Sequence, residues 1–186
     1  MAYLFNPDRL HEIVRRHLDL PREEQFRNII DDLAKEYPGH IETRQDWLFN
    51  LAGGVVGIMT ILHASLSEYV LLFGTPIGAQ GYSGRYLMDV YDFFLSGELV
   101  AYNETNFLAP VYTRPGEMAL LRRGKVKGFK LSEGSWMLEY GRGIIPASLP
   151  FALGDAIFSC FDIPTIVKTL WLYGKMVVKE LCKGKI

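Results

Sequence analysis

One glutamate, Glu139, lies within a short run of residues that favours a β-strand. Along residues 135–140, alternation places Glu139 and Met137 on one face of the strand and larger apolar side chains on the other. A carboxylate among such neighbours either faces solvent or is buried for a purpose, because glutamate is almost never fully buried without a partner. The residue pattern alone leaves both alternatives open.

Two further carboxylates are three residues apart in the candidate strand Tyr86–Leu95. Asp89 and Asp92 must point to opposite faces of a regular strand, so at most one faces the interior unless a β-bulge intervenes. Two carboxyl groups close together in an apolar pocket would share a proton, because ionising both is costly. Such a pair supplies a general acid and a general base, so we expect neither a metal nor an organic cofactor.

The histidines and cysteines give weaker signals. His63 is alone on an apolar stretch, and we interpret it as a hydrogen-bonded core histidine rather than a catalyst. Cys160 and Cys182 show no metal-ligand spacing and lie in apolar helical stretches, which predicts two reduced core thiols. The other histidines form no ligand spacing with His63: His11, His17 and His40.

Composition excludes several classes of protein. The 186 residues are 49% hydrophobic, which excludes disorder, and a formal net charge of -1 gives no support to nucleic-acid binding. The first sixteen residues do not have the organisation of a signal peptide. The longest apolar run, Leu51–Leu62, is well short of the about 20 residues that a spanning helix needs. We interpret this run as part of a soluble core.

Helical spacing dominates the first third of the chain. Asn6 is a candidate cap for a first helix with Pro7 at its first position, and a second helix starts near Pro21 and ends near Gly39. Thr43 is a candidate cap for a third helix. The sequence therefore predicts helices over about residues 7–62.

The middle of the chain changes to short strands. Gly, Pro or Asn separates these runs, a pattern typical of a barrel or sandwich over about residues 66–145. The basic residues between Arg122 and Lys130 are expected in a solvated hairpin. The predicted strands are Glu68–Phe73, Tyr86–Leu95, Glu98–Tyr102, Glu117–Leu121, Val126–Leu131 and Ser135–Tyr140.

Residues 146–182 return to helical spacing, in two helices. The second carries Lys168, Lys175 and Lys179 within about 40° of one another, at about 100° per residue. This basic stripe on an otherwise apolar helix indicates either a helix at a membrane surface or a core helix with one solvated face. We find no linker, and we treat residues 1–186 as a single domain.

Three long ungapped strings resemble the sterol C-8 isomerase / sigma-1 receptor family: residues 63–75 (HASLSEYVLLFGT), 83–86 (SGRY) and 136–146 (WMLEYGRGIIP). The chain is identified as a member over about Phe5 to about Leu181. Residues 122–129 and 149–151 look like the isomerase branch, whereas Asp92 and the Leu-Ser-Glu-Tyr segment look like the receptor branch.

This resemblance implies an α+β fold: a cupin-like β-barrel with N-terminal helices packed on it and a C-terminal helical pair lying on the membrane. It also implies a homotrimer at the endoplasmic reticulum membrane. Members of the family usually begin with a strongly apolar helix, whereas this chain starts at the first amphipathic helix. Either it is naturally monotopic or a leader was removed.

The resemblance also assigns residues. The ligand-pairing glutamate maps onto Glu139, the second acidic residue onto Asp92, and a nearby tyrosine onto Tyr69. Glu68 maps onto a glutamate that ties the barrel to a helix. The remaining ligand-binding candidates, which could instead be structural, are Trp136, Phe73 and Asp89.

Three functions follow as hypotheses. The first is a sterol Δ8–Δ7 isomerase that uses Glu139 and Asp92 as an acid/base pair. The second is a sigma-1-receptor-like protein that binds hydrophobic amines or sterols without turnover. The third is an inactive lipid-binding module of cupin type.

Overall fold

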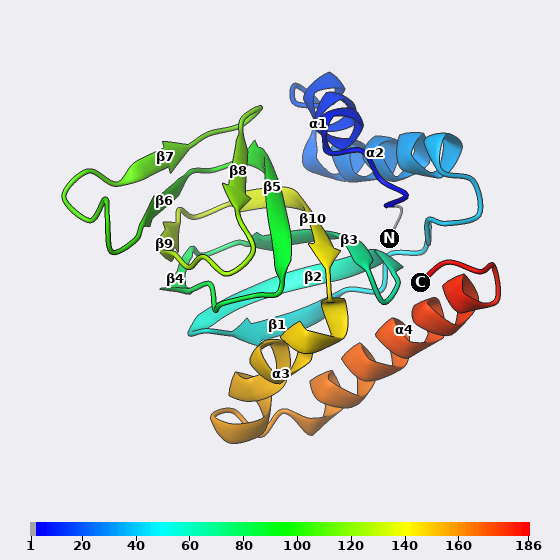
Figure 1. Cartoon of the computed structure of the whole chain (residues 1–186). Coiled ribbons are helices and arrows are strands. Elements are labelled where there is room, and N and C mark those ends of the chain that lie inside the picture. The colour runs from blue at the N-terminus through cyan, green and yellow to red at the C-terminus, as the bar shows by residue number, and fades with distance from the viewer. Residues whose placement is uncertain (1–2) are drawn as a thin grey trace.

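The computed structural model describes residues 3–186, in which two antiparallel sheets are flanked by two pairs of helices (Figure 1). One sheet has six strands in the order β1-β2-β3-β10-β5-β8, and the other has four in the order β4-β9-β6-β7. The strands are β1 Leu48–Ala52, β2 Val55–Ala64, β3 Glu68–Thr75, β4 Ala79–Tyr82, β5 Met88–Ser96, β6 Leu99–Tyr102, β7 Val111–Thr113, β8 Met118–Leu121, β9 Gly128–Leu131 and β10 Ser135–Gly143. The helices are α1 Pro7–Arg16, α2 Arg22–Glu36, the short 3-10 helix η1 Ile145–Ser148, α3 Leu149–Phe158 and α4 Ile163–Leu181.

The predicted α+β class is confirmed, and each predicted strand is present with shifted ends. The expected barrel takes the form of two separate hydrogen-bonded sheets across residues 3–186. An apolar cluster draws residues from both sheets, including Met59, Phe94, Leu131 and Met137. The space between the sheets is therefore an apolar interior.

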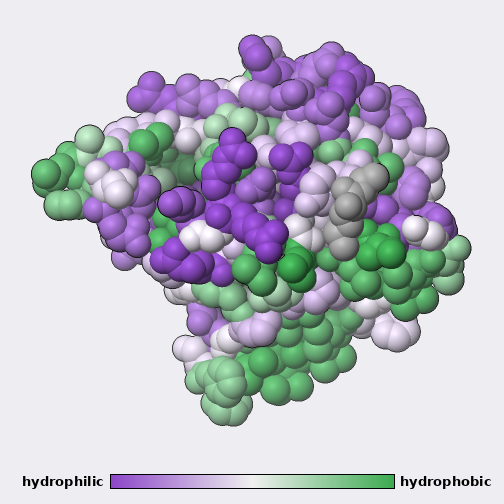
Figure 2. Space-filling view, in the orientation of Figure 1, coloured by the Kyte–Doolittle hydropathy of each residue, from purple (hydrophilic) through white to green (hydrophobic). Residues whose placement is uncertain are grey.

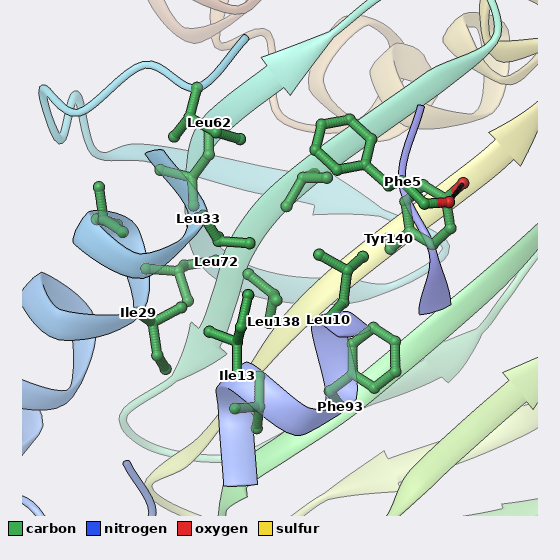
Figure 3. Packing of buried hydrophobic residues seen from close by; sticks show 14 of the residues in the cluster. Phe5, Leu10, Ile13, Ile29, Leu33, Leu62, Leu72, Phe93, Leu138 and Tyr140 are labelled. Carbon is green, nitrogen blue, oxygen red and sulfur yellow. Dashed lines mark hydrogen bonds between the residues drawn. The ribbon is translucent and has the colours of Figure 1, made fainter. Parts of the chain in front are cut away.

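Helices α1 and α2 cover the outer face of the six-stranded sheet. The Asn6 side chain accepts a hydrogen bond from the Asp8 backbone N–H at 2.8 Å, as expected for a helix cap. The apolar faces of both helices pack against the sheet in one buried cluster (Figure 3). Its members include Leu10, Ile13, Ile29 and Leu33 from the helices and Leu62, Leu72, Phe93 and Leu138 from the strands.

The predicted third helix is wrong, because residues 48–64 form the β1–β2 hairpin. Gly53 and Gly54 have φ values of 62° and 82°, which place the turn between the strands. Strand β2 is buried on both faces along most of its length, so its residues are apolar without alternation. A continuous apolar run of this kind is also typical of a buried helix. Pairing with β3 decides between the two, because only an extended β2 reaches its partner along Ile58–Ala64.

The predicted C-terminal helical pair is confirmed as α3 and α4, which lie along one side of the sheets (Figure 1). Helix α4 packs on β2 through Met176 and Val177, whereas Trp171 is 70% exposed. Apolar surface gathers over this part of the molecule (Figure 2). Among residues 3–186, no helix has both the length and the apolar character to cross a bilayer.

The prediction of two core thiols is wrong. Cys160 follows α3 and Cys182 caps the end of α4, and both are exposed. Each cysteine lies at the end of a helix, outside the part of the helix that packs on the protein. The apolar composition of the surrounding sequence did not indicate this position.

Candidate functional site

Glu139 and Asp92 lie side by side on neighbouring strands. In the β10–β5 ladder Glu139 is directly opposite Asp92, and both side chains face the space between the sheets. Residues directly opposite in an antiparallel pair have Cβ atoms about 5 Å apart. Met137 and Glu139 share this face of β10, as alternation predicted.

The space between the sheets contains a cavity of about 200 Å³ with a mostly apolar lining. Both sheets contribute to it, and α3 and α4 cover one side through Phe151, Ala152, Thr169 and Tyr173. The polar or ionisable side chains that converge on it include Tyr69, Ser83, Tyr86, Asp92, Lys127 and Glu139. An apolar cavity with a few convergent polar groups is the usual form of a small-molecule site.

Each carboxylate has one polar side chain as a partner. The Tyr69 hydroxyl donates to Glu139 Oε1 at 2.6 Å. Lys127 Nζ donates to Asp92 Oδ2 at 2.9 Å, and these two side chains are only 15% and 9% exposed. The two carboxylates therefore have different environments, one beside a hydroxyl and one beside an ammonium.

Glu139 is the strongly perturbed acid of the pair. The side chain is half-buried and faces the cavity rather than the outer surface of the molecule. Burial and then the charge of Asp92 raise the pKa of Glu139 to about 7, although the Tyr69 hydrogen bond and the Lys127 charge oppose this. Burial also raises the pKa of Tyr69 well above its usual range, so its hydroxyl stays a donor.

This arrangement places a protonated carboxyl beside an ion-paired carboxylate. Lys127 compensates the negative charge of Asp92, and Glu139 is about half protonated near neutral pH. The cavity can therefore be uncharged overall while still holding a proton donor and a proton acceptor. General acid–base chemistry on an apolar substrate needs these two groups in one dry site.

Lys127 is a site residue that sequence reasoning missed. It belongs to the basic run between Arg122 and Lys130, which was expected in a solvated hairpin. Arg122, Arg123 and Lys130 are exposed, but Lys127 turns inward just before β9. The neighbours of Lys127, Val126 and Gly128, were the local sign that this lysine differs from the rest of the basic run. They could not show that its partner is Asp92 on β5.

The other ligand-binding candidates divide. Phe73 lines the cavity, as predicted. Trp136 does not line the cavity, contrary to expectation, because alternation puts it on the opposite face of β10, where its ring centroid is 5.1 Å from that of Phe26 in α2. Asp89 also lies outside the cavity: it accepts from the Arg123 backbone N–H at 2.8 Å, on the opposite face of β5 from Asp92.

Glu68 ties the N-terminal segment to the sheet. Its fully buried carboxylate accepts from the backbone N–H of Leu4 and Phe5 and from the Tyr140 hydroxyl, at 2.8, 3.1 and 2.7 Å. Lys185 Nζ is 2.6 Å away. These contacts confirm the structural role predicted for Glu68.

Comparisons with known proteins find relatives over nearly the whole chain. The family model described as "ERG2 and Sigma1 receptor like protein" matches residues 1–185. The sigma non-opioid intracellular receptor 1 of Gallus gallus is 43% identical over 180 residues, which cover 96% of this chain and 81% of that protein. The C-8 sterol isomerase ERG2 of Gibberella zeae is 38% identical over 187 residues, covering 99% of this chain and 79% of that protein.

Solved structures give a weaker likeness. An RmlC-like cupin from Shewanella frigidimarina covers 54% of this chain and 85% of its own, with 12% identity and a TM-score of 0.45. The sequence match extends over nearly the whole chain and over about four fifths of each relative. On this evidence the chain belongs to the ERG2 and sigma-1-receptor-like family.

Proposed function

We propose that this protein is a sterol Δ8–Δ7 isomerase. The observation that carries the proposal is the unequal pair at the cavity: Glu139, with a pKa of about 7, opposite an Asp92 that is paired with Lys127. A sterol is uncharged, and a cavity whose internal charges cancel suits an uncharged ligand. The similarity to C-8 sterol isomerases supports the same activity.

The reaction moves one double bond without a net change of atoms. The Glu139 carboxyl donates its proton to C9, and the electron pair of the C8–C9 double bond forms the new C–H bond. The tertiary cation left at C8 is stabilised by the carboxylate of Asp92. Asp92 then accepts a proton from C7, and the electrons of that C–H bond become the C7–C8 double bond. After the product leaves, Asp92 releases its proton to water and Glu139 takes up a proton from water, which restores the starting state.

The cavity volume sets a condition on this reaction. A cavity of about 200 Å³ is smaller than the about 300–1,000 Å³ of typical ligand sites. A sterol therefore fits only if the covering segment moves. The part of the lining that belongs to α3, which comprises Leu149, Phe151 and Ala152, lies beside the edge strand β1, and we expect the movement there.

A second candidate is a binding protein for hydrophobic amines, and the similarity to sigma receptors supports it. An ammonium group near Glu139 favours the ionised carboxylate and lowers its pKa. Amine binding then converts Glu139 from an acid to a counter-ion. The same pocket serves both functions, so turnover is the property that separates them.

We also propose a peripheral location on the endoplasmic reticulum membrane, as in the family resemblance. The outer face of α3 and α4 supports this, because it carries exposed Phe158, Phe161, Val167 and Trp171 beside Lys168 and Lys175. A homotrimer is proposed on the same resemblance. A second apolar patch at the β6–β7 connection, which includes Phe107 and Leu108, is available for subunit contacts (Figure 2).

The decisive experiment is turnover in deuterated water. Purified protein in detergent is incubated with a Δ8-sterol, and the product is examined by mass spectrometry. We expect a Δ7-sterol that carries one deuterium at C9, and no product from the Glu139→Gln variant. A folded protein that binds a hydrophobic amine but forms no Δ7 product would contradict the isomerase proposal for that sterol and favour the binding protein.

A further inference from the structure

A second group of ionisable side chains lies outside the cavity, where three distant segments meet. His40 is in the loop after α2, His63 is near the end of β2, and Glu180 is in the last turn of α4. One ligand atom from each lies within 4.8 Å of the others. Residues 40 and 180 are far apart in sequence, so tertiary structure alone creates this cluster.

His63 has an unused ring nitrogen. The side chain is 1% exposed, and its Nδ1 lies 2.8 Å from the backbone carbonyl oxygen of His40. The carbonyl can only accept, so Nδ1 carries the proton and Nε2 presents a lone pair. Within residues 3–186, Nε2 finds no hydrogen-bond partner. A backbone carbonyl that fixes the tautomer in this way is the usual support of a metal-binding histidine.

Glu180 supplies a charged oxygen at the same place. The residue is 2% exposed, and its Oε1 accepts from Lys183 Nζ at 2.7 Å. Its Oε2 lies 2.6 Å from His40 Nδ1. Burial acts to raise the pKa of Glu180, but the hydrogen bonds from Lys183 and His40 outweigh it, and the pKa is lowered. The ion pair with Lys183 places this carboxylate as a charged oxygen donor, as a metal ligand must be.

We infer that His40, His63 and Glu180 form a binding site for a divalent transition-metal ion of the Zn²⁺ class. Two imidazole nitrogens and one carboxylate oxygen, with water as the fourth ligand, are a donor set that Zn²⁺ favours. His63 contributes its unpartnered Nε2, because its Nδ1 is already engaged with the His40 carbonyl oxygen.

Binding requires a small rearrangement. Ligands on tetrahedral zinc lie about 3.3 Å apart when each bond is about 2.0–2.1 Å long. His63 therefore moves closer to the other two ligands, which lie within 4.8 Å of it, whereas His40 Nδ1 and Glu180 Oε2, now 2.6 Å apart, separate by about 0.7 Å. The Nδ1–H proton of His40 moves to Nε2 of the same ring, which is partly exposed. Lys183 can remain on the other oxygen of Glu180.

A metal ion bound by His40, His63 and Glu180 would have a structural effect. It links the loop after α2, strand β2 and the end of α4, so it fastens the C-terminal helix to the sheet. The same helix covers the cavity through Thr169 and Tyr173. A bound metal ion is therefore expected to restrict α4 without contacting the ligand.

The test uses the full chain, purified without a histidine tag and treated with chelator. Equilibrium dialysis against Zn²⁺, followed by metal analysis, should give one ion per chain, and Co²⁺ should give the intense visible absorption of a four-coordinate site. The melting temperature should rise with Zn²⁺. His40→Ala should weaken binding at least tenfold, and because His40 is only partly buried this variant should fold.

Two matched controls exclude other sources of binding. His17→Ala removes a histidine whose Nε2 pairs with Asp32, and Cys182→Ser removes an exposed thiol near Glu180. Both should keep one Zn²⁺ per chain. The inference is overturned if the folded protein binds no stoichiometric metal, which would leave a buried water as the partner of His63, or if His40→Ala binds Zn²⁺ as tightly as the parent.

Discussion

Lys127 Nζ lies 2.9 Å from Asp92 Oδ2, and this contact spans the cavity between the two sheets. Asp92 belongs to β5 of the six-stranded sheet, and Lys127 directly precedes β9 of the four-stranded sheet. The pair is nearly buried, so removal of one partner leaves a charge without compensation. That relationship makes the site's electrostatics depend on both sheets.

Lys127→Met is the variant that tests this relationship. An uncompensated Asp92 beside Glu139 should cost about 3 kcal/mol of unfolding free energy. It should also raise the pKa of Glu139, because the Lys127 charge lowers it. Denaturant unfolding measures the first effect, and the pH–rate profile measures the second. The matched control is Lys130→Met, whose side chain is exposed on β9. Equal stability of the two variants would contradict the prediction.

The pH dependence of the isomerase should reflect the proton on Glu139. Activity requires the protonated carboxyl, so the rate should fall about tenfold per unit as the pH rises above about 7. Rates measured from pH 5 to pH 9 in one buffer series check this. A rate that stays constant through pH 8 would rule out Glu139 as the acid.

Stability should have a linked pH dependence. The folded-state pKa of Glu139 is about 7, above its ordinary value of 4.5, so the folded protein binds more protons than the unfolded chain between these values. The contribution of this group to the unfolding free energy therefore falls as pH rises, by at most about 1.4 kcal/mol per unit. Glu139→Gln should flatten this part of the pH–stability curve.

Tyr69→Phe should show whether Tyr69 positions Glu139 through its hydroxyl or only fills space beside it. The hydroxyl that donates to Glu139 Oε1 lowers the pKa of that carboxyl. Its removal should therefore raise this pKa and shift the alkaline limb of the pH–rate profile to higher pH. We expect an activity loss of about tenfold, since an aligned donor is lost. Tyr112→Phe, at an exposed position on β7, is the control. A loss of rate with an unmoved pH profile would indicate that Tyr69 only fills space.

Trp136 and Phe73 should give opposite results. Trp136→Leu removes a ring from the cluster beneath α2, so it should lower the melting temperature and leave ligand affinity unchanged. Phe73→Leu changes the cavity wall, so it should alter sterol or amine affinity severalfold. Titration with a fluorescent ligand and thermal unfolding measure the two effects. A change of affinity in Trp136→Leu would contradict its placement outside the cavity.

Trp171→Glu tests the proposed membrane face. A charge at this 70% exposed position should weaken binding to liposomes without lowering the melting temperature, because most of the side chain is in contact with solvent rather than with the protein. Ile77→Glu places the same charge at an exposed apolar position in the β3–β4 turn and serves as control. Equal liposome binding by both variants would argue against α4 as the contact surface.

Local sequence determined the features that depend on neighbours along the chain. Alternation placed Met137 with Glu139 on one face of β10, and a spacing of three separated Asp89 from Asp92. The Asn6 cap and the apolar spacing of the first two helices were likewise evident, because capping and amphipathic packing act within a few residues.

Tertiary structure decided the features that depend on distant partners. Residues 48–64 became strands because β2 pairs with β3, although their apolar run also fits a buried helix. Lys127 became a site residue only through Asp92, thirty-five positions earlier, and His40 meets Glu180 across 140 positions. Periodicity fixes which face a side chain occupies, but the partner on that face is set by how the sheets and α4 close around the core, which no local pattern encodes.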